Sequence, residues 1–537
     1  MRIEKGDRMM KKNPIAIFVI AFCFILLPNF HAFAAGSNDG GTLRIGTRIP
    51  QFNRIDVRYP TTASLVPVYD LIYEPLFEWG KDGFKTLIPK LAVGYETDDA
   101  KIWTVHLRKG VIFHNGREMT AEDVKVNLNW RITTPTGWKP VAYQSYLKHL
   151  NRVEVVDNYT LKIVLDQPFS SLMRVMTLAF RGVAPPEEVE KYQQQFMLHP
   201  SGTGPFKVVE IRQNEKVVLE RFEHYWGPRP HIDRVEALFI RSDDDRLKAL
   251  QNGDIDICQV YDDAKPILEK DPDLQFEAVT ATSTMHINDF NMRRWPMNDI
   301  RFRKAYWMGA DWKNIAINAV PFSSGQHPRT FLDRSQYFNP EAVELVPAYN
   351  PEEAKDLVRE AEKDAGKKIP PIYYYVDSTS TPDKAVAESA KFQLEQVGIP
   401  INLQLMSHVL WFDGILKDPD IEWDTAAIGF DFAADPGLGF VGFLTDSGIA
   451  PDGKSLGGYS NPEFDRWITE AESTLDEREQ TNAYQEAEKI LLQDAAAFPL
   501  YFLRLLIAWN NRVKGVVNHP TASINVVNSY TNLWLEQ

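Results

Sequence analysis

Two aspartates, Asp431 and Asp435, follow a short apolar segment in the second half of the chain. The segment begins at Thr425 and reads Thr-Ala-Ala-Ile-Gly-Phe, a pattern typical of a buried strand. In open α/β sheets, ligands bind outside the carboxyl ends of strands. We therefore predict that this strand end is the floor of a ligand cleft. The candidate ligand-binding residues are Phe430, Asp431, Phe432, Asp435, Trp411, Phe412 and Arg48, the last of which follows the first expected strand.

Acids among aromatic residues suit a peptide, a sugar or an organic cation as ligand. The chain is rich in aromatic residues, with 13 Trp, 20 Tyr and 30 Phe. Patterns that would indicate a reaction are weak. Residues 448–455 fit a nucleotide-binding loop, but turn sequence follows where a helix is needed. Residues 145–148 fit Ser-x-x-Lys without its companion motifs. We predict no enzyme, no catalytic residues, no cofactor and no metal site.

The bulk composition is that of a soluble globular protein with two or three domains in 537 residues. The net charge is −14, and removal of a leader with five basic and two acidic residues takes it to −14 − 3 = −17. An acidic surface disfavours nucleic acid as a partner. Beyond the leader, Cys258 is the sole cysteine in the sequence, so an internal disulfide is excluded.

The N-terminus reads as an export signal. Lys11 and Lys12 precede an apolar run from Pro14 to Leu27, and Ala32-Phe33-Ala34 is a small-x-small cleavage site. The run is too short to span a membrane. Cys23 follows a phenylalanine, which does not fit a lipidation site. We expect cleavage after about Ala34 and a periplasmic location.

Hydrophobic patterning divides the mature chain into two lobes and an insertion. A strand over 102–107, a helix opening at Thr120 and a hairpin turning at Asp157-Asn158 form an α+β subdomain. Strand, helix and strand then alternate through the second lobe, which predicts α/β structure. Residues 499–509 read as one strand returning to the first lobe. The predicted segments are 1–34 signal peptide, 35–65 lobe I, 66–199 inserted subdomain, 200–282 lobe I, 283–494 lobe II and 495–537 lobe I.

Several short motifs in a fixed order resemble the family 5 extracellular solute-binding proteins of ABC importers, the dipeptide and oligopeptide binding proteins. Each motif is weak alone and the ordered set is strong. The motifs lie at 73–77, 106–124, 202–206, 252–256, 299–305, 458–462 and 498–501.

The resemblance implies an α/β, two-lobed periplasmic binding protein (type II, cluster C-like) with an extra α+β subdomain inserted in lobe I. It implies a monomer that closes its lobes around a peptide or other small solute by hinge motion. The closed form would dock on the ABC permease and ATPase complex of the inner membrane. By position, Asp431 matches the family's acid for a ligand ammonium, although it lies one residue further from Pro436 than is usual and Phe432 takes the strict alignment.

Dipeptide binders of this family have an arginine for the ligand carboxylate in the loop that matches 376–383, and this chain has none there. This departure disfavours strict dipeptides. Longer peptides, opine-like amino-acid conjugates and oligosaccharides remain alternatives within the family, and a nickel chelate fits less well. From another class, an exported hydrolase is the distant alternative.

Overall fold

The structure, a computed structural model, describes most of the chain beyond the predicted leader. The described residues are 39–48, 55–58, 66–80, 82, 84–133, 147, 149–278, 284–319, 327–378, 380–406, 422–431, 435–443, 455–502, 505–516 and 531–536. The predicted signal peptide, 1–34, lies outside them. Among the helices of these ranges, none has the length and apolar character needed to cross a bilayer.

Lobe I is built on a seven-stranded mixed sheet in which β1 is the central strand. β1 pairs in parallel with both β10 and β11, whereas β9 and β18 run antiparallel to their neighbours. The sheet order is β12 (Leu274–Ala278), β18 (Leu505–Asn510), β11 (Ile257–Tyr261), β1 (Thr42–Thr47), β10 (Arg234–Phe239), β9 (Lys216–Arg221) and β8 (Phe206–Arg212). Its helices are α1 (Val66–Ile72), α5 (Pro186–Tyr192), α6 (Asp243–Gln251) and α7 (Lys265–Leu268).

A separate hydrophobic core, from Leu76 to Val183, lies in the segment predicted as the inserted subdomain. Here β5 is paired on both sides by antiparallel strands, and the alternating burial of its residues confirms the predicted half-buried strand. The strands are β4 (Ala92–Glu96), β5 (Ile102–Leu107), β7 (Thr160–Leu165) and β6 (Leu150–Asp157), with β2 (Phe77–Trp79) and β3 (Leu87–Pro89) as a separate pair. The helices are α2 (Ala121–Thr133) and α4 (Leu172–Ala179).

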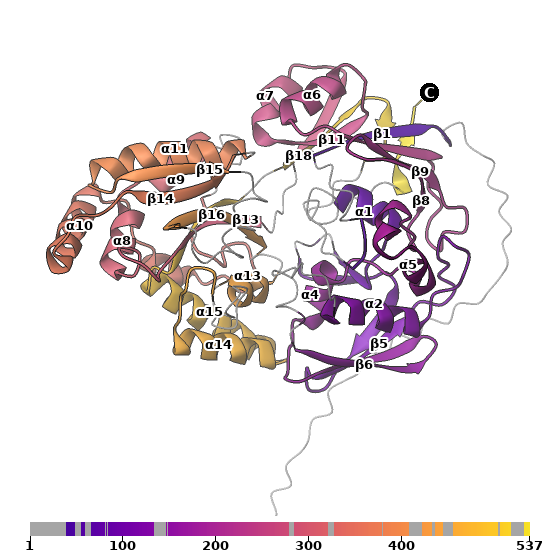
Figure 1. Ribbon diagram of the computed structural model, residues 1–537, viewed down its shortest axis with the longest axis horizontal. Helices are drawn as coiled ribbons and strands as arrows, with labels where there is room; N and C mark the ends of the chain where they lie inside the picture. The colour runs from indigo at the N-terminus through magenta and orange to yellow at the C-terminus, as the bar shows by residue number, and fades with distance from the viewer. Residues whose placement is uncertain are drawn as a thin grey trace, which may run out of the picture. The chain divides into compact units, whose positions relative to one another are not determined.

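Lobe II has its own core, from Met285 to Phe502, around a five-stranded mixed sheet (Figure 1). β16 lies inside this sheet between β14 and β13, so the predicted buried strand is confirmed. The order is β15 (Ile401–Met406), β14 (Ile372–Asp377), β16 (Thr425–Asp431), β13 (Thr284–Phe290) and β17 (Ala497–Phe502). The helices are α8 (Ile300–Met308), α9 (Trp312–Ala319), α10 (Pro351–Ala365), α11 (Thr381–Gln396), α13 (Pro436–Phe443), α14 (Pro462–Ser473) and α15 (Glu477–Gln493).

Local sequence signals explain where several helices begin. Ser242, Asn350 and Asn461 are N-caps, and each side chain accepts a backbone N–H of the first turn. Pro351 and Pro462 follow their caps at the first helical position, where a missing N–H is tolerated. The three acids after Ser242 occupy the first turn of α6, where the helix dipole favours negative charge.

The prediction of a single strand over 499–509 is wrong, because the structure has two strands there. β17 pairs with β13 of lobe II, whereas β18 pairs with β11 and β12 of lobe I. Both strands are largely buried and apolar, and the one charged residue between them in the sequence, Arg504, does not by itself indicate a change of sheet. The domain boundaries stay predictions, and this pairing favours a return to lobe I after Phe502 over one at 495.

Candidate functional site

The strand end that carries Asp431 faces the side of lobe II from which the chain crosses to lobe I. Asp431 ends β16 opposite Thr284, the first residue of β13. β17 ends at Phe502 on the same edge, where it pairs with Met285. β14 runs parallel to β16 and ends at Asp377. The carboxyl ends of the parallel strands and both crossings to lobe I therefore meet at one edge, where α/β sheets bind ligands.

The corresponding edge of lobe I carries Arg48 and Tyr261. Arg48 follows β1 and Tyr261 ends β11, and these strands are parallel. The Arg48 guanidinium donates to the Tyr261 hydroxyl, lies 4.5 Å from the centre of the ring and is 3.8 Å from Asp243. Burial opposes the charged form of Arg48, whereas Tyr261, Asp243 and, from lobe II, Asp377 favour it, and the net effect raises its pKa.

Three buried side chains of lobe II form a polar cluster close to this edge. His286 Nδ1 lies 2.8 Å from the Asp383 carboxylate, and the Tyr501 hydroxyl donates to the same oxygen at 2.5 Å. The His286 and Tyr501 rings are stacked with centres 4.7 Å apart. Burial disfavours ionised Asp383, but His286 and Tyr501 outweigh it and lower its pKa. Sequence reasoning missed this cluster because its members come from three elements with no local motif.

Electrostatic coupling joins the two edges. The pKa of Tyr261 is raised mainly by burial, and Asp383 on lobe II adds to the effect. The pKa of Tyr501 is raised well above its ordinary value, again mainly by burial, with contributions from Asp383 and from Tyr261 on lobe I. The carboxyl edges of the two sheets therefore lie within electrostatic reach of each other and form the candidate functional site.

Asp435 has a different environment from the one expected for a residue open to ligand. Its side chain is 0% exposed, Oδ1 accepts the Gly437 N–H at 2.9 Å and Oδ2 accepts the Ser171 hydroxyl at 2.8 Å. Arg174 Nη1 lies 3.5 Å from Oδ2. Burial raises the pKa of Asp435, although Arg174 and Ser171 oppose the rise. Both carboxylate oxygens are thus occupied, one of them by the inserted subdomain.

The remaining predicted residues are placed only in part. Phe430 and Asp431 are the last residues of β16. Phe432, Trp411 and Phe412 lie outside the described residues. The ligand-binding role of all seven candidates stays a prediction.

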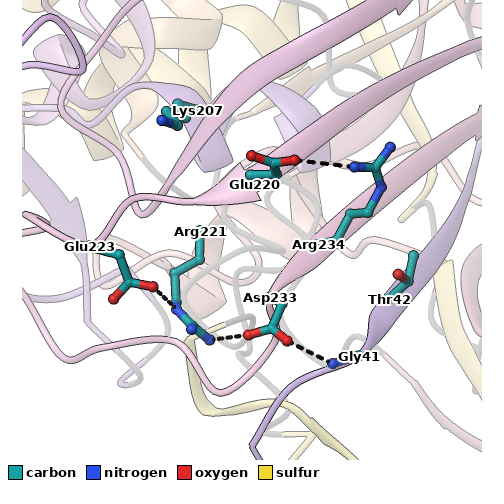
Figure 2. Close-up of a pocket in the computed structure, with 8 residues that line it drawn as sticks. All are labelled: Gly41, Thr42, Lys207, Glu220, Arg221, Glu223, Asp233 and Arg234. Carbon is teal, nitrogen blue, oxygen red and sulfur yellow. Dashed lines mark hydrogen bonds and ion pairs between the residues drawn. The ribbon is translucent and has the colours of Figure 1, made fainter.

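A pocket of about 530 Å³ lies on lobe I along β1, β8, β9 and β10 (Figure 2). Its acids are paired with its own arginines: Arg221 lies 2.7 Å from Asp233 and 2.9 Å from Glu223, and Arg234 lies 3.2 Å from Glu220. The pocket is part of lobe I's own sheet and contains none of the predicted ligand residues. We interpret it as a charge-paired surface and not as the solute cleft.

Two of the motifs on which the resemblance rests, at 73–77 and 202–206, have structural roles. Glu74 is buried, and its carboxylate accepts the Tyr225 hydroxyl at 2.7 Å, Trp226 Nε1 at 2.6 Å and the Thr203 hydroxyl at 3.1 Å. A Cβ added at Gly202 would lie 2.2 Å from the Ile72 carbonyl oxygen, so the backbone packs too closely there for any side chain. The motifs at 73–77 and 202–206 therefore join where the chain enters and leaves the inserted subdomain.

Two further motifs hold lobe II together. Arg303 is buried and donates to the backbone carbonyls of Met297, Asp494 and Ala495. Tyr459 and Asn461 both donate to the Asp494 carboxylate at 2.8 Å. Because these residues stabilise the fold, the motifs that contain them indicate the fold and carry no information about the ligand.

Metal and nucleotide chemistry finds no support in the described part of the chain. No group of three or more His, Cys, Asp or Glu residues there is arranged to hold a metal ion. At the end of the nucleotide-loop pattern, Ser455 donates to the Tyr459 carbonyl, and the next helix begins only at Pro462. A phosphate loop needs a helix N-terminus at its Lys-Ser pair, so the pattern is coincidental.

Comparison with known proteins identifies relatives over most of the chain. Residues 86–450 match the model of the family described as "Bacterial extracellular solute-binding proteins, family 5 Middle". The glutathione-binding protein GsiB of Escherichia coli O1:K1 / APEC is 26% identical over 466 residues, which are 82% of this chain and 85% of GsiB.

Solved structures share the fold at lower identity. AgaA from A. tumefacien R10, in complex with agropinic acid, has a TM-score of 0.79 at 22% identity, covering 93% of this chain and 99% of AgaA. DppA from Helicobacter pylori, in complex with the peptide STSA, has a TM-score of 0.75 at 21% identity, with coverage of 93% and 99%. The predicted two-lobed α/β fold is confirmed. The chain therefore belongs to the bacterial extracellular solute-binding proteins of family 5.

Proposed function

We propose that this chain, the substrate-binding component of an ABC importer, captures a peptide-like solute between its lobes and releases it unchanged to the permease. Asp431 pairs with the solute's ammonium group at the carboxyl edge of the lobe II sheet. Phe430, Phe432, Trp411 and Phe412 supply apolar contacts, and Arg48 acts from lobe I. The partners are the membrane permease and its ATPase, and the protein acts as a periplasmic monomer.

The observation that carries this proposal is the position of Asp431. It ends an inner strand of lobe II, at the edge where the chain crosses to lobe I. An ammonium is an apt partner for an acid there because lobe closure removes water and strengthens the attraction between opposite charges. The relatives are solute-binding proteins and not enzymes, which favours capture without a reaction.

A second candidate solute is an opine. The loop over 376–383 carries no arginine, so the carboxylate of a dipeptide would lack the partner that dipeptide binders provide. An opine-like conjugate arranges its carboxylates differently, and AgaA, a neighbour in fold, was solved with agropinic acid. The loop's lack of an arginine is the observation that keeps this candidate beside the peptide.

Calorimetric titration with a defined panel tests the proposal. The panel contains glutathione, Met-Leu, the peptide Ser-Thr-Ser-Ala, agropinic acid and maltotetraose. We expect a peptide-like solute to bind and to lose about 2 kcal/mol of binding free energy in Asp431→Asn. The N-acetylated form of the same solute, which has no ammonium, should bind both proteins equally weakly. Binding of the oligosaccharide alone would contradict the proposal.

A further inference from the structure

One turn of the inserted subdomain contacts lobe II through side chains that are distant in sequence. Ser171 Oγ donates to Asp435 Oδ2 at 2.8 Å. Arg174 Nη1 lies 3.5 Å from the same oxygen and donates to the Tyr337 hydroxyl at 2.8 Å. Asp435 and Tyr337 both belong to lobe II, so one helix end of the inserted subdomain binds two separate loops of that lobe.

The same turn makes a second set of hydrogen bonds with α14 and α15. The Ser170 backbone N–H donates to the Glu472 carbonyl at 2.5 Å, and Ser170 Oγ accepts from Gln480 Nε2 at 2.9 Å. The Tyr337 hydroxyl donates to Gln480 Oε1 at 2.7 Å, which connects the two sets. We call the connected residues the latch. They are Ser170, Ser171 and Arg174 on the inserted subdomain, and Tyr337, Asp435 and Gln480 on lobe II.

The two sides of the latch belong to different hydrophobic cores. α4, which begins directly after Ser171, contributes to the core that spans Leu76 to Val183. Tyr337 belongs to the core of lobe II. The chain enters and leaves the inserted subdomain from lobe I, so a hinge motion that separates the lobes also separates this subdomain from lobe II and breaks the contacts between them. The latch is therefore made or lost as a unit with the arrangement of the lobes.

We propose that the latch holds the closed form and that Asp435 is a positioning residue, which acts through Ser171 and Arg174 and does not touch the solute. The proposal rests on the proposed function, since it assumes that the lobes open to admit a solute. Asp435 is 0% exposed with both oxygens engaged, so a solute ammonium could reach it only by displacing these partners. This assigns different roles to Asp431 and Asp435.

The contacts that Asp435 makes with Ser171 and Arg174 set the expected size of the effect. The Ser171 hydroxyl donates to the Asp435 carboxylate, and the half-buried Arg174 guanidinium lies near the same oxygen. Both interactions stabilise the closed form, in which they are made. Loss of both is expected to lower the ratio of closed to open molecules about tenfold, which corresponds to ~1.4 kcal/mol. Because only the closed form retains the solute, its dissociation should accelerate by a similar factor.

Single-molecule energy transfer between dyes on the two sides tests the latch. Val156 of β6 and Leu475, between α14 and α15, are 56% and 47% exposed, so Val156→Cys and Leu475→Cys provide labelling positions. The remaining Cys258 is buried. The labelled parent is compared with the same protein carrying Ser171→Ala and Arg174→Gln. Both are measured alone and with glutathione, Met-Leu, Ser-Thr-Ser-Ala and agropinic acid.

In the Ser171→Ala/Arg174→Gln variant, we expect the ratio of molecules with efficient energy transfer to molecules with inefficient transfer to fall about tenfold. Arg152→Gln is the matched control, since Arg152 pairs with Glu154 inside the subdomain, and it should behave as the parent. Equal transfer distributions for parent and latch variant under every condition would overturn the proposal. So would an equal loss in the Arg152→Gln control.

The test separates this proposal from the proposed function. If the latch variant shifts the populations while no peptide-like solute binds, the latch stands and the peptide proposal fails. If a peptide binds parent and variant with the same affinity and the same dissociation rate, the solute proposal stands and the latch fails. Thermal unfolding of each variant verifies that the compared molecules are folded.

Discussion

Glu74 and Asp435 are both buried carboxylates, and each lies where two parts of the chain with separate hydrophobic cores meet. The contacts of Glu74 persist in every arrangement of the lobes, whereas those of Asp435 with the inserted subdomain form in the closed arrangement. Glu74 lies where the inserted subdomain leaves lobe I, and its donors Thr203, Tyr225 and Trp226 lie just after the chain returns. Besides the local Gly437 N–H, Asp435 is contacted by Ser171 and Arg174 of the inserted subdomain. The first junction ties two covalently adjacent segments together, and the second depends on the lobes being closed.

Burial alone does not indicate what a buried acid does in this protein. Burial raises the pKa of both Glu74 and Asp435, and hydrogen-bond donors oppose the rise in both. What separates them is where the donors lie in the chain. Those of Glu74 follow the return of the chain to lobe I, whereas Ser171 and Arg174 reach Asp435 from the inserted subdomain. We therefore expect substitutions of Glu74 to affect folding and substitutions of Asp435 to affect solute retention.

The largest expected effect is on Glu74. Glu74→Ala leaves three donors without their acceptor and should lower the free energy of unfolding by about 4 kcal/mol. Urea denaturation measures it. Glu154→Ala, which removes an acid paired on the surface of the same subdomain, should change the free energy by no more than about 0.5 kcal/mol. Similar losses in both variants would remove Glu74 from the junction.

Gly202 tests the same permanent junction by crowding it. Gly202→Ala places a Cβ 2.2 Å from the Ile72 carbonyl oxygen, and a backbone group cannot move aside without shifting the junction. We expect a loss of about 3 kcal/mol in the free energy of unfolding. Gly94→Ala is the matched control because nothing lies within 4 Å of its added Cβ. A Gly202→Ala variant as stable as Gly94→Ala would contradict the geometry of the junction.

Asp289 is a third buried acid. Among the described residues, its carboxylate accepts a hydrogen bond from the neighbouring Phe290 N–H and not from a group in another part of the molecule. Burial raises its pKa to about 7, and Oδ2 has no partner in the described part of the structure. Because the folded-state pKa is raised above the unfolded value, its contribution to stability is present below about pH 4 and is lost as pH rises towards 7. Asp289→Asn should therefore be about 2 kcal/mol more stable than the parent at pH 8 and equal to it at pH 4.

Unfolding curves at several pH values measure this difference. A parallel pH dependence in the parent and in Asp289→Asn would show that the acid is hydrated or paired in solution. The same measurement on Asp435→Asn serves as a contrast, since that acid has donors to lose.

The smallest effect on folding is expected for Asp435. Asp435→Ala should lower the free energy of unfolding by about 1 kcal/mol or less. When the lobes separate, water hydrates Ser171 and Arg174, so these residues do not depend on Asp435 for a hydrogen-bond partner. The same variant should weaken solute binding about tenfold. Calorimetry with a solute that binds the parent, beside urea denaturation, measures both quantities. A folding loss as large as that of Glu74→Ala would end the distinction between the two junctions.

The sequence predicted features that depend on neighbours along the chain. The strand that begins at Thr425 and the hairpin at Asp157-Asn158 follow from local patterns, and both were confirmed. The caps at Ser242, Asn350 and Asn461 depend on the same kind of local signal. Contacts between distant segments had no local signature. Ser171 and Asp435 are 264 residues apart, and His286, Asp383 and Tyr501 come from three elements.

Contacts between distant segments also explain why Asp435 was predicted to bind ligand and why residues 499–509 were predicted to form one strand. An acid before a proline is typical of a turn in water, and nothing near Asp435 in sequence indicates Ser171 or Arg174. β17 and β18 are both largely buried, and nothing in their apolar sequences indicates that they join different sheets. The motifs predicted the family because several of them have structural roles, and for the same reason they carry no information about the ligand.

Native mass spectrometry of the protein purified from cells that naturally express it tests the central claim most directly. We predict one retained small molecule per chain, with the mass and fragmentation of a peptide-like amine, released unaltered on denaturation and absent from the Asp431→Asn variant. A retained oligosaccharide, or an amine retained equally by Asp431→Asn, would contradict the account.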